Sequence, residues 1–187
     1  MSLVALEIVQ PSPMSLSHQN SRRVESVAEP MEGDSVAFNH VGICVSDLER
    51  SRRFYEEVLQ FRYWWELAVP DEGSSQLLQL PAPLGATAVY LAHERFVLEL
   101  IHFAEAGIRP SPQRVMNNPG LTHLSIAVAD ISSTLEKVVP NGGEILEDTS
   151  VGGGAIMIRD PDGQLIELTS FHFHAMRPPW PDDRSPA

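Results

Sequence analysis

Bulky apolar residues alternate with small or polar residues in two short segments of the chain, at positions 41–45 and 124–128. This period of two predicts half-buried β-strands, with the bulky residues together on one face. That face carries Val41, Ile43 and Val45 in the first segment, and Leu124, Ile126 and Val128 in the second. Because an apolar face must be covered by another element, we expect a helix to follow each strand.

A histidine lies on the opposite face of each predicted strand. His40 shares its face with Gly42 and Cys44, and His123 shares its face with Ser125 and Ala127. Small neighbours leave room beside a polar side chain. We therefore expect each histidine to line an open concave surface rather than to be buried in a packed core.

An amphipathic helix is predicted after each strand. The first begins at a capping box, Ser46 to Glu49, and its apolar stripe consists of Leu48, Tyr55, Val58 and Leu59. The second begins at Asp130 and ends at the Pro-Asn-Gly-Gly segment 140–143, with apolar residues Ile131, Leu135, Val138 and Val139. Each helix has one apolar face that can cover the bulky face of its strand.

Three further strands are predicted after each helix. They are Phe61–Val69, Ala86–Ala92 and Phe96–His102 in the first half, and Glu144–Thr149, Ala155–Arg159 and Gln164–Thr169 in the second half. The Asp-Pro-Asp-Gly segment 160–163 predicts a turn between the last two strands. The predicted fold class is therefore α+β, with two tandem βαβββ modules.

The chain divides into five predicted regions. These are a mobile leader at 1–35, a first module at 36–104, a linker at 105–120, a second module at 121–172 and a disordered tail at 173–187. The leader is rich in Ser, Pro, Glu and Met, and the tail is rich in Pro. The first module is longer than the second, and we place its extra residues in a loop between Pro70 and Gly85.

The two modules repeat their candidate chemistry. His40 and His123 occupy matching positions, and each module carries a glutamate in its last strand, Glu99 or Glu167. Two imidazoles and two carboxylates suit one borderline divalent metal ion, which could be Zn, Ni, Co, Mn or Fe. With an open coordination position, such an ion acts as a Lewis acid on a carbonyl, and a glutamate beside it can move a proton. We assign all four residues as metal ligands, and the two glutamates as candidate catalytic residues.

Composition narrows the possible partners. The chain has 187 residues, 43% of them hydrophobic, which allows a buried core. Its net charge of −12 argues against nucleic-acid or anionic-membrane binding, since both need clustered Lys and Arg. We therefore expect a small-molecule substrate. The single cysteine, Cys44, and the lack of a secretory signal or a long apolar run predict a cytoplasmic protein.

These motifs resemble the vicinal oxygen chelate superfamily, which includes glyoxalase I. The resemblance rests on the segments 40–59, 97–100, 123–130 and 159–168. It implies that the paired modules form a half-closed eight-stranded cleft around one metal ion, with ligands at His40, Glu99, His123 and Glu167. It further implies a lyase or isomerase of the glyoxalase I type, acting on a small carbonyl compound or thiol adduct. A glutamate, by preference Glu167, would then transfer a proton through an enediolate.

Other activities of the superfamily are alternatives at this stage. Methylmalonyl-CoA epimerases commonly carry Gln where this chain carries Glu99, which favours glyoxalase-like chemistry. An iron-dependent extradiol dioxygenase uses two histidines and one carboxylate with open positions, whereas Glu99 supplies a fourth ligand here. A protein of the bleomycin resistance type would use the cleft only to bind a drug. An acidic cleft could attract a cationic drug.

A homodimer is expected, because each module leaves sheet edges that proteins tend to pair or cover. Members of the superfamily commonly dimerise, and their cleft forms within one chain or between two. The linker at 105–120 is long enough for either arrangement. The sequence therefore leaves both open.

Two adjacent tryptophans, Trp64 and Trp65, lie in the predicted strand at Phe61–Val69. Neighbouring side chains of a strand point to opposite faces, so the two indoles are separated by the sheet. We assign the pair to core packing, with a place in the cleft for one indole as the alternative.

Overall fold

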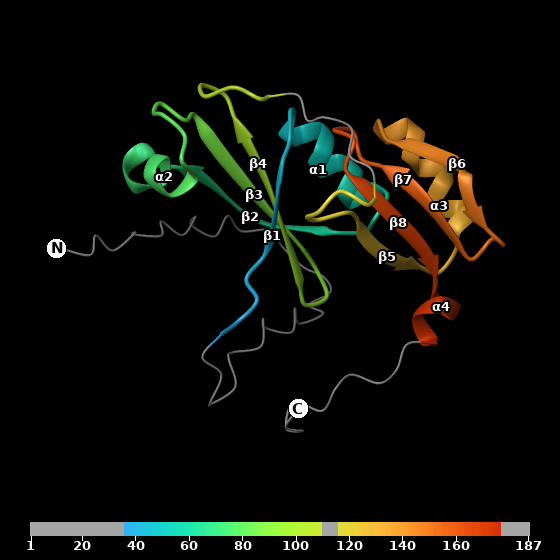
Figure 1. The fold of residues 1–187 in the computed structure, drawn as a ribbon. Helices are drawn as coiled ribbons and strands as arrows, with labels where there is room; N and C mark the ends of the chain where they lie inside the picture. The colour runs from blue at the N-terminus through green and yellow to red at the C-terminus, as the bar shows by residue number, and fades with distance from the viewer. Residues whose placement is uncertain (1–35, 110–115, 177–187) are drawn as a thin grey trace, which may run out of the picture. The chain divides into compact units, whose positions relative to one another are not determined.

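The computed structural model describes residues 36–109 and 116–176. The chain divides into a first unit, residues 1–37, and a second, compact unit that begins at Phe38. The predicted leader, most of the predicted tail and the middle of the predicted linker lie outside the described residues. The second unit contains both predicted modules (Figure 1).

The first module consists of one four-stranded sheet and two helices. Its elements are β1 (Val41–Cys44), α1 (Leu48–Glu57), β2 (Arg62–Val69), α2 (Asp71–Leu78), β3 (Ala86–His93) and β4 (Phe96–Phe103). The strand order is β1-β4-β3-β2, with β1 parallel to β4 and the other pairs antiparallel. The parallel pair requires a long connection, and α1 lies within it.

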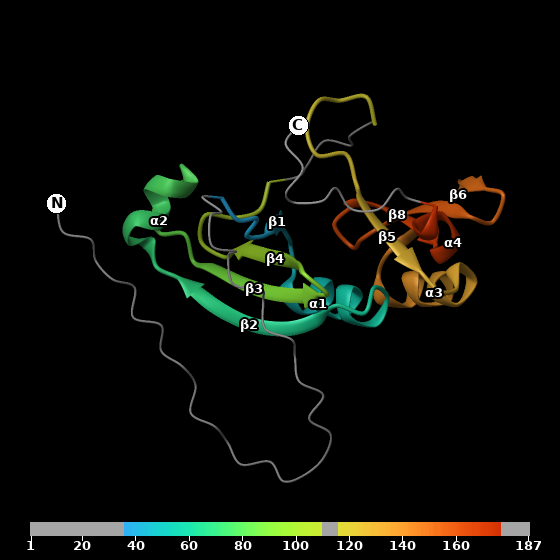
Figure 2. The ribbon, with the colours of Figure 1, turned by 90° about the horizontal axis from the view of Figure 1, so that it is seen from below.

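The second module repeats this arrangement. Its elements are β5 (Leu124–Val128), α3 (Ile131–Val138), the 3₁₀ helix η1 (Val139–Asn141), β6 (Glu144–Val151), β7 (Ala155–Arg159), β8 (Leu165–Ser170) and α4 (Phe171–Ala175). The strand order is β5-β8-β7-β6, with β5 parallel to β8 (Figure 1). Figure 2 shows the neighbouring strands β5 and β8 from a second direction. The predicted α+β class with tandem βαβββ modules is confirmed. Within the described residues, the eight strands form two separate four-stranded sheets.

The helix that follows the first strand of each module, α1 or α3, is capped by an aspartate. The Asp47 side chain accepts a hydrogen bond from the Arg50 amide at 3.0 Å, and Asp130 accepts one from the Ser133 amide at 3.1 Å. The predicted capping box therefore differs from the observed cap, which is Asp47 rather than Ser46. Ser46 instead bonds to a residue of the second module.

The predicted loop between Pro70 and Gly85 contains a short helix, α2. Helical geometry is interrupted inside α2, and no residue of the helix is buried. The Asp71 carboxylate accepts a hydrogen bond from the Leu84 amide at 2.8 Å, which ties the start of the helix to the end of the insertion. Leu84 is fully buried in a small second core with Ala86 and Phe103. The insertion is therefore anchored at both ends.

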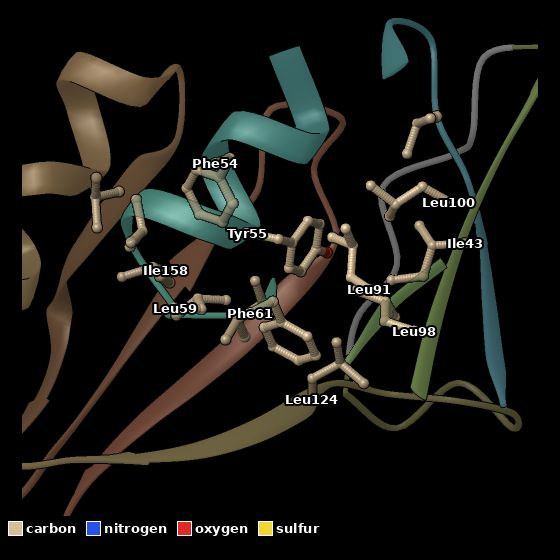
Figure 3. Packing of buried hydrophobic residues seen from close by; sticks show 14 of the residues in the cluster. Ile43, Phe54, Tyr55, Leu59, Phe61, Leu91, Leu98, Leu100, Leu124 and Ile158 are labelled. Atoms are coloured by element: carbon tan, nitrogen blue, oxygen red, sulfur yellow. The ribbon is translucent and has the colours of Figure 1, made fainter. Parts of the chain in front are cut away.

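The main hydrophobic core combines side chains of both modules (Figure 3). Phe54 and Tyr55 of α1 are fully buried there, and their rings meet edge to face with centroids 5.5 Å apart. Gly143 permits this packing, because a Cβ atom at that position would lie 2.5 Å from Phe54 Cε2. Helix α1 therefore buries two adjacent aromatic rings in a single core that both modules share.

A polar clasp joins α1 to the turn between β7 and β8. The buried hydroxyl of Tyr55 donates to Asp160 Oδ2 at 2.9 Å. Arg50 Nη2 donates to Asp162 Oδ1 at 2.9 Å, and the Ser46 amide donates to Asp162 Oδ2 at 3.0 Å. Burial raises the pKa of Asp160 although three hydrogen bonds favour its ionised form. Burial and the neighbouring Asp160 carboxylate raise the pKa of Tyr55.

The last described segment is helical. The predicted tail began at residue 173, whereas α4 continues to Ala175, and the remainder lies outside the described residues. Among the helices of the described part of the chain, none is long and apolar enough to cross a membrane.

Candidate metal centre

The first candidate ligand pair is formed by His40 and Glu99. His40 immediately precedes β1, and Glu99 lies in the middle of β4, where it pairs in register with Gly42 of the parallel β1. His40 Nε2 lies 3.4 Å from Glu99 Oε2, and the two side chains are 31% and 15% exposed. A Cβ atom at Gly42 would lie 3.0 Å from the same carboxylate oxygen, so the glycine leaves space for the pair.

The second pair is formed by His123 and Glu167, at matching positions of the second module. His123 Nε2 lies 3.7 Å from Glu167 Oε2, and the side chains are 27% and 33% exposed. Glu167 pairs in register with Ser125, whose hydroxyl donates to Glu167 Oε2 at 2.6 Å. The Thr122 hydroxyl lies 2.9 Å from His123 Nδ1. That contact orients the ring with Nε2 toward the carboxylate.

Two aromatic residues complete the first site: Tyr90, which the sequence did not indicate, and Trp65, for which a place in the cleft was the alternative to core packing. Tyr90 of β3 pairs in register with Glu99, and its hydroxyl donates to Glu99 Oε1 at 2.6 Å. The Trp65 ring stacks on the Tyr90 ring with centroids 4.3 Å apart and planes 3° apart. The His40 ring meets the Tyr90 ring edge-on at 5.7 Å. Burial, followed by the hydrogen bond to Glu99, raises the pKa of the Tyr90 phenol.

The predicted role of the tryptophans in core packing was wrong. Trp64 is half exposed, and Trp65 is partly exposed beside the candidate ligands. A β-bulge between Tyr63 and Trp65 shifts the register of β2 against β3. The simple alternation that placed the two indoles on opposite faces therefore does not continue through this part of the strand.

The structure brings the four predicted ligands together as two separate pairs. Among the described residues, no group of three or more His, Cys, Asp or Glu side chains is close enough to hold a metal ion. His40 Nδ1 is buried and lacks a hydrogen-bond partner in this part of the chain. Each pair thus offers one imidazole and one carboxylate from its own module.

The geometry of each pair fits two ligands of one divalent ion. Two ligands that are each about 2.1 Å from a tetrahedral zinc ion lie about 3.4 Å apart. The histidine and glutamate atoms are separated by 3.4 Å in the first pair and 3.7 Å in the second. Neutral imidazole and carboxylate are also the donors that borderline divalent ions accept. The donor set is therefore suited to such an ion.

Cys44 is an exposed residue near the start of α1 that carries no comparable chemistry. Partial burial and the carboxylate of Asp162 raise the pKa of its thiol. A nucleophilic cysteine requires the opposite shift, toward the thiolate. The candidate chemistry of the molecule therefore lies with the two histidine–glutamate pairs.

Comparisons with known proteins identify relatives of this chain by sequence and by fold. Residues 37–168 match the Glyoxalase/Bleomycin resistance protein/Dioxygenase superfamily. A lactoylglutathione lyase from Arabidopsis thaliana is 29% identical over 139 residues, which cover 72% of this chain and 44% of that protein. The chain thus spans less than half the length of this curated relative.

Solved structures share the fold. A glyoxalase family protein from Bacillus cereus has a TM-score of 0.64 at 18% identity, over 76% of this chain and 98% of that chain. The trypanothione-dependent glyoxalase I of Leishmania major has a TM-score of 0.53 at 24% identity, over 73% of this chain and 87% of that chain. With most of its length matched, from residue 37 to residue 168, this chain belongs to the Glyoxalase/Bleomycin resistance protein/Dioxygenase superfamily.

Proposed function

We propose that this protein is a divalent-metal-dependent lyase or isomerase of the glyoxalase I type. Its substrate would be a small carbonyl compound or a thiol adduct, converted by proton transfer through an enediolate. The observation that carries the proposal is the repeated pair, in which a histidine nitrogen faces a glutamate oxygen at 3.4 Å and again at 3.7 Å. The relative named lactoylglutathione lyase supports the same class of reaction.

His40, Glu99, His123 and Glu167 would hold the metal ion. When bound, the ion would supply Lewis-acid stabilisation of the negative charge that develops on the substrate oxygens. The chain's own contribution is to orient the ligands. The Thr122 hydroxyl engages Nδ1 of His123, and a hydroxyl donor holds each glutamate. Gly42 and Ser125, which share a face with the histidines, accommodate the two glutamate carboxylates.

Glu167 is our candidate for the proton-transferring base. Its side chain is 33% exposed, against 15% for Glu99, so it has more freedom to reach a substrate carbon. In this role the carboxylate takes a proton from one carbon and returns it to the adjacent carbon. Glu99 would remain a fixed ligand.

A complete set of four ligands is proposed to form between two copies of the chain. The first-module pair of one copy and the second-module pair of another would supply two imidazoles and two carboxylates. The separation of the two pairs among the described residues motivates this arrangement. We expect light scattering to give the mass of a homodimer at micromolar concentration. A monomer that binds metal through all four residues would contradict the proposal.

The expected working environment is a reducing compartment such as the cytoplasm, because the chain has a single cysteine. The net charge of −12 supports a small-molecule substrate rather than a nucleic acid.

The decisive experiment combines a metal assay with a turnover assay. Purified protein is loaded with Zn²⁺, Ni²⁺, Co²⁺, Mn²⁺ or Fe²⁺, and the isomerisation of a glutathione–2-oxoaldehyde adduct is followed. We expect stoichiometric metal and metal-dependent turnover that Glu167→Gln lowers by at least about 10²-fold. The matched control is Glu147→Gln, an exposed glutamate on β6 of the same module. Full activity in Glu167→Gln would overturn the proposal, and a protein without affinity for any of these ions would instead fit a drug-binding role.

A further inference from the structure

The two carboxylate oxygens of Glu99 have different partners because one of them accepts a hydrogen bond from Tyr90. Oε1 accepts the phenol at 2.6 Å, whereas Oε2 faces His40 Nε2 at 3.4 Å. A carboxylate held in this way presents one oxygen toward the histidine and keeps the other occupied. The rotation that would exchange the two oxygens must break the short hydrogen bond.

The phenol is itself restrained by its neighbours. Trp65 stacks on one face of the Tyr90 ring at 4.3 Å, with the planes nearly parallel, and His40 meets the ring edge-on. Trp65 and Tyr90 are paired in register on adjacent strands, so the sheet holds them opposite each other. The hydroxyl is therefore delivered from a ring with little freedom to move.

The second module has no aromatic counterpart at the matching positions. Met157 pairs in register with Glu167, and Leu146 pairs with Met157, where the first module has Tyr90 and Trp65. The donor to Glu167 is instead Ser125, a short side chain on β5. Of the two glutamates, only Glu99 is therefore held by an aromatic residue.

We propose that Tyr90, supported by Trp65, is a positioning residue that fixes Glu99 as a one-oxygen ligand directed toward His40. This inference rests on the proposed metal site and adds to it a residue that acts through a ligand rather than on the substrate. Partners that orient a ligand contribute to metal affinity, because they remove motions that the metal would otherwise have to restrict.

The test is a titration of the metal-free full-length chain with Zn²⁺ by calorimetry. We expect Tyr90→Phe, which removes only the hydroxyl, to weaken binding by about 10- to 100-fold, the usual effect of losing a partner of a metal ligand. Tyr90→Met, which copies the second module, should weaken it at least as much. Two controls should bind as the wild type does: Met157→Leu at the matching position of the second module, and Tyr63→Phe on the exposed part of β2.

Two further readouts separate positioning from a merely structural role. Visible absorption of bound Co²⁺ reports coordination geometry, and we expect Tyr90→Phe to change it. In a Glu99→Ala background the same Tyr90→Phe change should have no further effect on Zn²⁺ affinity, because the phenol acts through that carboxylate. Unchanged affinity and an unchanged spectrum in Tyr90→Phe, with a wild type that binds Zn²⁺, would overturn this inference alone. A wild type without metal affinity would overturn the proposed function as well.

Discussion

The two modules have the same strand order but hold their glutamates differently. Glu99 is the less exposed of the two and accepts a phenol from β3, whereas Glu167 is more exposed and accepts a hydroxyl from β5. Gly42 occupies the register position that Ser125 occupies in the second module. The repeat therefore preserves the place of the ligand pair, while the donor that holds the carboxylate comes from a different strand in each module.

The last hairpins of the modules differ as well. β3 and β4 are joined by Glu94 and Arg95 alone, whereas the longer turn between β7 and β8 carries Asp160 and Asp162. Those two carboxylates bond to α1 of the first module. A difference in turn length thus supplies a contact between modules that the repeat by itself does not contain.

The largest expected effect is on catalysis, and it compares the two glutamates directly. Glu167→Gln should lower turnover by about 10²- to 10⁴-fold, the usual contribution of a positioned acid or base. Glu99→Gln should lower it less, because its proposed role is to hold the metal. Incorporation of solvent deuterium into the product, measured in both variants, distinguishes the roles. Wild-type rates with equal incorporation in both variants would remove the assignment of a base to either residue.

The shared core gives the next largest effect. Leu98 in the first module and Leu168 in the second are both fully buried in the main core. Each change to Ala should lower the free energy of unfolding by about 2–5 kcal/mol. Because one core includes both modules, denaturant unfolding followed by fluorescence and by circular dichroism should show a single transition. Two separate transitions would mean that the modules unfold independently. Leu77→Ala, at an exposed position, is the control.

The clasp between α1 and the β7–β8 turn should contribute less. Tyr55→Phe removes the hydroxyl that bonds to the buried Asp160 carboxylate, and the free energy of unfolding should fall by about 1–3 kcal/mol. Tyr63→Phe, at an exposed position, serves as the matched control. If both variants unfold at the same denaturant concentration as the wild type, the hydrogen bond from Tyr55 to Asp160 does not contribute to stability.

The smallest expected effect is a pH dependence that arises from Asp160. Its pKa is raised in the folded protein by burial, so the folded state keeps the proton more readily than the unfolded state does. Stability from this group is present below the ordinary pKa of 3.8 and is lost as pH rises through the interval above that value. In Asp160→Asn, this decrease in stability with rising pH should be absent. Urea unfolding of both proteins across a pH series tests this, and parallel stability curves would contradict it.

Local patterns in the sequence determined most of the secondary structure. The strand Ala155–Arg159 is observed with the predicted bounds, and the helix predicted to begin at Asp130 begins one residue later with Asp130 as its cap. Both features depend on neighbours within a few residues, either through the alternation of side chains along a strand or through a side chain that bonds to the next turn. The repeat of His40 with Glu99 and of His123 with Glu167 also identified the residues that the structure pairs.

Contacts between segments that are far apart in the chain could not be predicted from the sequence alone. Ser46 was predicted to cap α1, but a carboxylate from the second module competes for its hydroxyl and its amide. Trp65 was assigned to the core, but the register of β2 with β3 places it opposite Tyr90, on which its ring stacks. In both cases local preference predicts one partner, and a residue far along the chain supplies another.

The hydrogen-bond donors to the two glutamates are the clearest example of contacts that the sequence alone could not predict. Tyr90 and Ser125 were each present in a predicted strand, yet nothing local indicated that they would bond to Glu99 and Glu167. That depends on the register of β3 with β4 and of β5 with β8, and a shift of one residue would turn the donor to the opposite face. The sequence by itself determined which residue types form the pairs. Only the tertiary structure decided which oxygens face the histidines, because register depends on the packing of the whole sheet.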